Sequence, residues 1–126
     1  MTRSAAASCL VVDDSRIIRH LARRVLEAQG CRVEEAADGL EALAACRGRM
    51  PGCILLDWTM PLMNGLEFLA ALRAEFPREL PPVVFCTVRT GAALVRQAMD
   101  AGARDYIIKP YDPARMVAAL AGLGVL

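Results

Sequence analysis

The chain has 126 residues, the length of one domain, and 56% of them are hydrophobic, so we expect one folded core and little disorder. Fifteen basic residues against fourteen acidic ones leave a net charge of +1, which provides no general attraction to nucleic acids or anionic membranes. The function must therefore reside in a local site.

The cysteines and the amino-terminal segment predict a soluble, cytoplasmic protein. The five cysteines are odd in number, form no C-x-x-C pair and mostly lie in apolar runs, so we expect reduced, buried thiols and neither disulfides nor a zinc site. The amino terminus lacks the apolar core of a signal peptide. The longest apolar stretch, residues 116–126, is too short to span a membrane.

Short apolar runs alternate along the chain with longer segments of helical periodicity. This alternation is typical of a parallel sheet flanked by helices, and four of the five runs are apolar enough to be buried on both faces. The predicted strands are, in chain order, residues 9–12, 32–34, 53–56, 83–86 and 106–108.

The segments between and after these strands carry the signals of amphipathic helices. The predicted helices are residues 15–29, 39–46, 66–75, 92–101 and 113–120. In the first helix the apolar stripe consists of Ile18, Leu21, Ala22, Val25 and Leu26. Capping residues are expected near the helix starts at Ser15, Asp38, Asn64, Thr90 and Asp112, and glycine stops at Gly30 and Gly102.

Polar side chains follow four of the predicted strands. Asp13 and Asp14 follow the first strand, Asp57 the third, Thr87 the fourth, and Lys109, the only lysine of the chain, the fifth. Because the carboxyl ends of parallel strands meet at one edge of the sheet, we expect these five side chains to be neighbours.

Three clustered carboxylates repel one another, and Mg²⁺, a hard cation with oxygen ligands, relieves that repulsion. Such a site has open positions for phosphoryl oxygens, which Thr87 and Lys109 are placed to hold. Asp57, which has no acidic neighbour in the sequence, is the expected nucleophile, forming an aspartyl phosphate. Asp13 and Asp14 then serve the metal.

Four segments carry a family resemblance: VVDDSRIIR at 11–19, AADGLEAL at 36–43, ILLDWTMPLMNGLEFL at 54–69 and DYIIKPYD at 105–112. The chain closely resembles the CheY-like, chemotaxis-type receiver domain of two-component response regulators. The resemblance implies a flavodoxin-like α/β fold, in which a doubly wound, five-stranded parallel sheet has the strand order 2-1-3-4-5. It also implies one receiver domain over residues 1–126, with no effector domain.

The resemblance further implies a cycle in which a histidine kinase phosphorylates Asp57 and the phosphate is later hydrolysed. Asp14, Asp57 and the backbone carbonyl of Thr59 would bind Mg²⁺ directly, and Asp13 would bind it through water. Thr87 would bond a phosphoryl oxygen, and Lys109 would form a salt bridge to the phosphate.

Four other positions match family features. Tyr106 matches the switch aromatic, which turns inward when Thr87 moves toward the phosphate. Lys109–Pro110 matches a bond that is cis in the family. Thr59 and Arg89 occupy positions that tune the dephosphorylation rate.

Several alternatives remain open from the sequence. Output through a flagellar motor switch component is the family's suggestion, but a phosphate sink or a relay to a phosphotransfer protein is equally compatible. A receiver-like scaffold that is not phosphorylated would normally lack members of the site. A haloacid-dehalogenase-type enzyme would require an aspartate at Thr59, and a nucleotide-binding module would require a glycine-rich loop after the first strand.

A histidine and a group of arginines in the first predicted helix are most simply interpreted as surface residues. His20 is distant in sequence from the strand ends and is expected to be a surface residue. Arg16, Arg19, Arg23 and Arg24 could contact a kinase or a phosphotransfer helix, although a solvated face is the commoner meaning of such a cluster.

Overall fold

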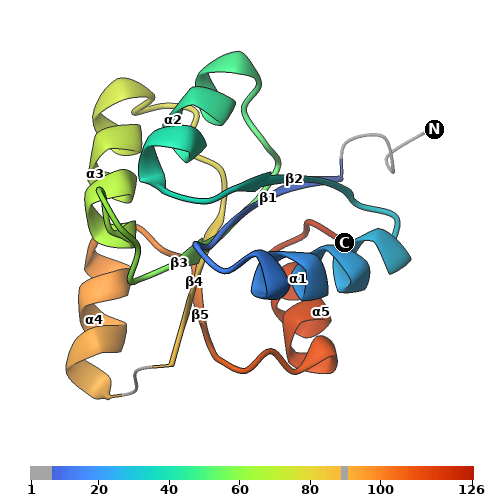
Figure 1. Ribbon diagram of the computed structural model, residues 1–126. Coiled ribbons are helices and arrows are strands. Elements are labelled where there is room, and N and C mark those ends of the chain that lie inside the picture. Colours follow the sequence, from blue (N-terminus) through green and yellow to red (C-terminus); the bar gives the residue numbers. More distant parts are fainter. Residues whose placement is uncertain (1–6, 89–90) are drawn as a thin grey trace.

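The computed structural model describes residues 7–88 and 91–126. Five strands and five helices alternate along the chain and form a parallel sheet of order β2-β1-β3-β4-β5 (Figure 1). The elements are β1 (Ser8–Val12), α1 (Arg16–Ala28), β2 (Arg32–Ala36), α2 (Gly39–Gly48), β3 (Ile54–Asp57), α3 (Gly65–Glu75), β4 (Val83–Thr87), α4 (Ala92–Asp100), β5 (Asp105–Ile108) and α5 (Pro113–Gly122). The predicted flavodoxin-like fold and strand order are confirmed.

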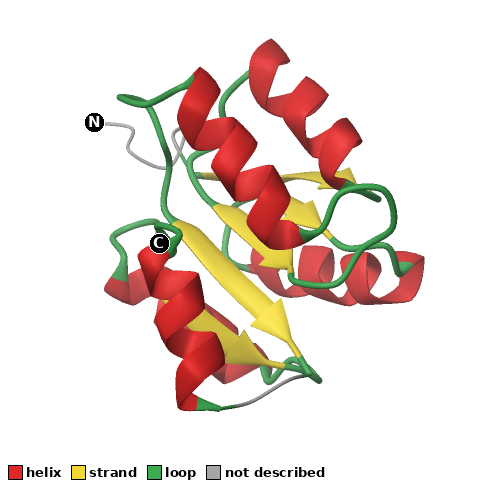
Figure 2. Ribbon diagram, turned by 90° about the vertical axis from the view of Figure 1, so that its left-hand side faces the viewer, coloured by secondary structure: helices red, strands yellow, loops and turns green. Residues whose placement is uncertain are grey.

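The sheet lies between two helical layers. Helices α1 and α5 cover one face, where Ala22, Leu26 and Met116 pack on strand residues such as Val11 and Leu55. Helices α2, α3 and α4 cover the other face (Figure 1). All strand pairs are parallel, and the strands seen in Figure 2 run in the same direction between the helices. Every strand therefore ends at the same edge, which we call the carboxyl edge; the opposite edge is the amino edge.

The strands differ in burial according to their place in the sheet. All residues of β3 and β4 are buried, as are Cys9–Val12 of β1. The prediction of four strands buried on both faces was wrong for β5, where Ile108 is 43% exposed. The reason is topological, because β5 is an edge strand with a neighbour on one side only. The other edge strand, β2, buries only Ala36.

Helix starts follow the predicted capping residues in four cases. The side chains of Ser15, Asp38, Asn64 and Asp112 accept hydrogen bonds from backbone N–H groups in the first turns of α1, α2, α3 and α5. Thr90 lies outside the described residues, and the N-cap of α4 is Gly91, which makes no side-chain capping bond.

One position of the first helical stripe was predicted incorrectly. Leu21 is 49% exposed, whereas Ala22 and Leu26 are buried. Successive residues of a helix are separated by about 100°, so Leu21 lies beside the row that faces the sheet. The glycines at both predicted stops, Gly30 and Gly102, have positive φ angles of 87° and 112°, as left-handed termination requires.

The five cysteines are all free and buried. Burial raises the pKa of the Cys46 thiol to about 11 and that of Cys86 to about 12, which keeps both thiols protonated and unreactive. Within residues 7–88 and 91–126, no helix is both long and apolar enough to cross a bilayer.

Candidate phosphorylation and metal site

Three carboxylates converge at the carboxyl edge, as the strand ends predict. Asp57 is the last residue of β3, and Asp13 and Asp14 follow β1 directly. One oxygen from each lies within 4.8 Å of the others. Asp13 and Asp57 are buried, at 1% and 7% exposure, whereas Asp14 is exposed. The cluster thus has one open side, toward solvent.

Lys109 is the cation of this cluster. Its Nζ donates to Asp13 Oδ2 at 2.5 Å and lies 3.1 Å from Asp57 Oδ1, and its side chain is only 11% exposed. The Lys109 backbone N–H donates to the Thr87 carbonyl oxygen at 2.8 Å, so β4 positions the lysine. The Lys109–Pro110 peptide bond is cis.

The charges of this cluster are not balanced. One ammonium faces three carboxyl groups, two of them buried. Burial is the largest effect on Asp57 and raises the pKa of its carboxyl; Lys109 opposes this effect, and the neighbouring Asp13 and Asp14 reinforce it. Burial lowers the pKa of Lys109, but its bonds to Asp13 and Asp57 outweigh burial and the net pKa is raised. The lysine therefore remains charged.

The donor set fits a hard divalent cation. Oxygens of three carboxyl groups lie close enough to share one ion, and carboxylate oxygens with open positions suit Mg²⁺. A divalent cation bound there would offset the negative charge that Lys109 leaves uncompensated.

Other residues predicted for this site are Thr59, Thr87, Arg89 and Tyr106. Thr87, the last residue of β4, is 2% exposed, and Tyr106 of β5 is 9% exposed and opposite Phe85. Trp58 packs against both aromatic rings, with centroid distances of 5.0 Å to Phe85 and 6.5 Å to Tyr106. Thr59 is exposed beside Trp58. Arg89 lies outside the described residues.

Gly65 brings α3 close to the end of β3. Its N–H donates to the Trp58 carbonyl at 2.9 Å, and a Cβ at this position would stand 2.4 Å from the Asp57 carbonyl oxygen and 2.8 Å from the Phe85 ring. Only glycine permits this approach. The capping box of Asn64 and Glu67 fixes the helix start at this point.

Sequence reasoning missed one contact of this site. Arg19, one turn into α1, donates from Nη1 to the backbone carbonyl of Asp13 at 2.7 Å and from Nε to Glu35 Oε1 at 2.9 Å. The sequence showed Arg19 only as one member of a basic cluster. His20, the next residue, is exposed as predicted.

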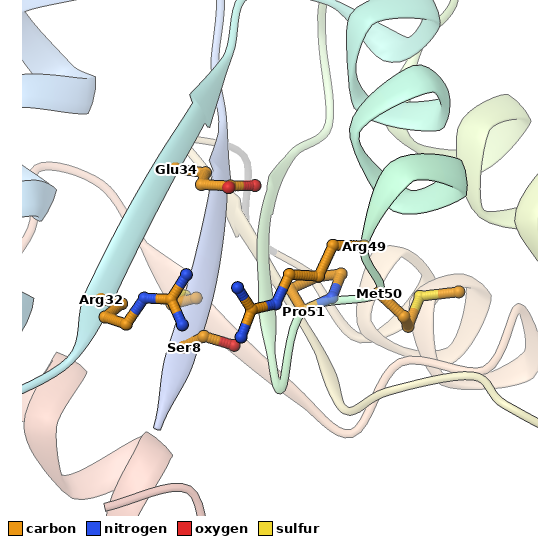
Figure 3. Close-up of a pocket in the computed structure, with 7 residues that line it drawn as sticks. Ser8, Arg32, Glu34, Arg49, Met50 and Pro51 are labelled. Carbon is orange, nitrogen blue, oxygen red and sulfur yellow. The ribbon is translucent and has the colours of Figure 1, made fainter. Parts of the chain in front are cut away.

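A pocket at the amino edge contains none of the predicted site residues. Figure 3 shows the Arg32 and Arg49 side chains extending toward the same region near Ser8. Ser8 Oγ accepts a hydrogen bond from Gly52 N–H at 2.9 Å. Within the described part of the chain, neither arginine forms an ion pair.

A doubly wound α/β fold with an acidic cluster and a lysine at its carboxyl edge defines the class of receiver-like signalling domains. The profile of the response regulator receiver domain family matches residues 9–121. The chain belongs to this family, and it is a CheY-like receiver domain of a two-component response regulator, a class that acts as a phosphorylation-dependent signalling switch.

Named relatives include both DNA-binding regulators and chemotaxis proteins. The DNA-binding response regulator MtrA of Mycolicibacterium paratuberculosis is 37% identical over 109 residues, which cover 86% of this chain and 47% of MtrA. The chain thus spans about half the length of the curated relatives it matches.

Several solved structures match nearly the whole chain. The chemotaxis protein CheY4 of Vibrio cholerae is 33% identical with a TM-score of 0.87, and the match covers 93% of this chain and 98% of CheY4. The chain matched in the CheX–CheY–BeF3–Mg complex of Borrelia burgdorferi is 25% identical with a TM-score of 0.87, and the match covers 94% of this chain and 90% of that one.

Proposed function

We propose that this protein accepts a phosphoryl group from a histidine kinase on Asp57, in a Mg²⁺-dependent reaction, and signals by phosphorylation-dependent binding to another protein. The observation that carries the proposal is the cluster of Asp13, Asp14 and Asp57, in which Lys109 bridges Asp13 and Asp57. A buried carboxylate beside two further acids and one lysine has no evident structural purpose, because burying charges costs stability.

In this proposal each side chain of the cluster has a part in the transfer. A carboxylate oxygen of Asp57 attacks the phosphorus of a phosphohistidine; the new O–P bond forms as the P–N bond breaks, and the imidazole leaves with the bonding electrons and takes up a proton. Mg²⁺, held by Asp14, Asp57 and the Thr59 carbonyl, with Asp13 acting through water, would neutralise the charge of the phosphoryl oxygens. Lys109 and Thr87 hold the other phosphoryl oxygens.

The same residues provide the proposed switch. Lys109 and Thr87 are joined through the bond between their main chains, and Tyr106 contacts Trp58, which directly follows the phosphoacceptor. A shift of Thr87 toward the phosphate changes the packing around Tyr106 and with it the surface formed by α4, β5 and α5. Thr59 and Arg89 tune the lifetime of the phosphate.

The surface around the acidic cluster suits protein partners. Five of the large hydrophobic side chains that stay exposed lie close to strand carboxyl ends: Ile17, Leu40, Leu62, Val88 and Ile108. Exposed apolar side chains around a polar site are typical of a protein docking surface. Arg16 and Arg24, exposed on α1, add positive charge for an acidic partner.

From the similarity to CheY4, we propose that the downstream partner is a flagellar motor switch component in chemotaxis. A phosphate sink or a relay to a phosphotransfer protein is the alternative. We place the cycle in the cytoplasm, with output through contacts of the receiver domain itself and not through nucleic acid or a membrane.

The test is incubation with acetyl phosphate, with and without Mg²⁺, followed by intact-mass measurement of the wild type and of Asp57→Asn. We expect one added phosphoryl group in the wild type with Mg²⁺, and none without the metal or in the variant. Equal gain in both proteins would overturn the assignment of Asp57. No gain in the wild type would instead favour a receiver-like scaffold that is not phosphorylated.

A further inference from the structure

The turn after β1 carries two acids that are held very differently. Both carboxylate oxygens of Asp13 are bonded, Oδ1 by the Ser15 N–H at 2.8 Å and Oδ2 by Lys109. Asp14 is exposed, and its side chain makes no hydrogen bond or ion pair within residues 7–88 and 91–126. Without such bonds, the backbone sets the direction of its Cα–Cβ bond.

That backbone is held by Arg19. The peptide group joining Asp13 to Asp14 is planar, so fixing the Asp13 carbonyl also fixes the N–H of Asp14 and the direction in which its Cα emerges. The Arg19 Nη1 bond to this carbonyl, at 2.7 Å, is a charge-assisted bond from a side chain that is only 15% exposed.

Arg19 is itself anchored from β2. Its Nε donates to Glu35 Oε1 at 2.9 Å, and Glu35 Oε2 accepts from Arg23 Nε at 2.6 Å. Burial raises the pKa of Glu35, but the bonds from Arg23 and Arg19 outweigh it and the pKa is lowered, so Glu35 stays ionised. The charge of Arg19 next to the acidic cluster is thus largely compensated.

We propose that Arg19 is a positioning residue for the metal site: through the Asp13–Asp14 peptide it orients the Asp14 carboxylate toward the cation, with Glu35 as its anchor. This inference rests on the proposed function, since it requires the Mg²⁺ site described above. It assigns to one member of the basic cluster a role different from partner docking.

The sign of the effect separates positioning from simple electrostatics. Removing a positive charge near three carboxylates should by itself strengthen Mg²⁺ binding. If Arg19 positions Asp14, Arg19→Ala must weaken binding in spite of the lost charge. We expect the dissociation constant to rise about tenfold, the lower end of the effect of residues that orient metal ligands.

Arg23→Ala is the matched control. Arg23 lies one turn further along α1 and also binds Glu35, but its other partner is Glu27 and not the Asp13 carbonyl. Trp58 fluorescence during Mg²⁺ titration gives the affinity, and circular dichroism in EDTA gives the fold and the unfolding temperature. We expect Arg23→Ala to bind Mg²⁺ within about twofold of the wild type, the scatter expected of a surface pair.

Every outcome decides the inference. Unchanged or tighter binding by Arg19→Ala overturns it, and so does equal weakening in Arg19→Ala and Arg23→Ala, which would indicate a general loss of helix packing. If Arg19→Ala does not fold, Arg19→Lys replaces it in the test. Lysine keeps the charge but lacks the planar guanidinium that bonds the Asp13 carbonyl and the Glu35 carboxylate together. Wild-type Mg²⁺ affinity in that variant overturns the inference. A wild type that does not bind Mg²⁺ at all refutes the proposed function instead.

Discussion

The two edges of the sheet are built from the same five strands but hold their charges in opposite ways. At the carboxyl edge, Asp13, Asp57 and Lys109 are largely buried and bonded to one another. At the amino edge, Arg32 and Arg49 are exposed and stand near Ser8 without an ion pair among the described residues.

The difference shows which edge of the sheet carries buried charges that lower the stability of the fold. Buried charges of one sign destabilise a protein unless another group compensates them, so the carboxyl edge is a site that the fold must support from several elements. Exposed arginines are hydrated and add little to stability. The net charge of +1 therefore conceals an acidic cluster at one edge and basic side chains elsewhere on the surface.

The largest expected contrast comes from removing one cation at each edge. Lys109→Met leaves the carboxylate of Asp13 buried without its ammonium partner, and we expect a loss of about 3 kcal/mol in unfolding free energy. Arg32→Met, at an exposed position without an ion pair, should change it by less than about 0.5 kcal/mol. Urea unfolding in EDTA measures both values, and similar losses in the two variants would remove the distinction between the edges.

The next contrast comes from adding one methyl group at each edge. Gly65→Ala places a Cβ against the Asp57 carbonyl and the Phe85 ring, and overpacking of this kind costs about 2 kcal/mol. Gly48, the last residue of α2, has open space around it, so Gly48→Ala should gain about 0.5 kcal/mol by restricting the unfolded chain. Thermal unfolding followed by circular dichroism tests both signs; a stable Gly65→Ala would refute the close approach.

Sequence reasoning identified the acidic cluster and the fold because both depend on topology. Each polar residue directly follows an apolar run, and parallel strands must bring such ends together. The exposure of Leu21 and Ile108 was missed in this way, because it depends on the angular position of Leu21 on the helix and on the place of β5 at the edge of the sheet.

The bond from Arg19 to Asp13 was beyond sequence reasoning for a different reason. Periodicity assigns a residue to a face of a helix, but a bond between a guanidinium and a backbone carbonyl six residues earlier depends on the exact turn that joins strand and helix. Four arginines occur in that helix and the sequence does not distinguish them, whereas the structure gives Arg19 and Arg23 different partners.

Magnesium should stabilise the protein through one edge only. A ligand at ten times its dissociation constant raises the unfolding free energy by about 1.4 kcal/mol. We expect this gain in the wild type and in Arg32→Met, and its loss in Asp57→Asn, which lacks one of the three clustered carboxylates. Differential scanning fluorimetry over a Mg²⁺ series measures it. An equal gain in Asp57→Asn would place the ion elsewhere.

The smallest expected effect concerns an ion pair at the amino edge. Asp105, the first residue of β5, accepts hydrogen bonds from Arg115 of α5 at 3.0 and 3.3 Å, and both side chains are partly exposed. Burial raises the pKa of Asp105, but the bonds from Arg115 and from the Tyr106 N–H outweigh it, and the net pKa is lowered.

A lowered pKa means that the pair stabilises the fold when the pH is above the ordinary carboxyl value of about 4, and that this contribution is lost as the pH falls through the depressed value. We therefore expect Arg115→Met to cost about 0.5 kcal/mol at pH 7 and nothing at a pH below that value. High salt should also reduce the difference, since exposed pairs are screened. If the difference in unfolding free energy between variant and wild type persisted in acid and in salt, Arg115 would act mainly through its bond to the Tyr106 carbonyl at 2.9 Å. The amino edge would then also rely on a charged side chain bonded to the backbone.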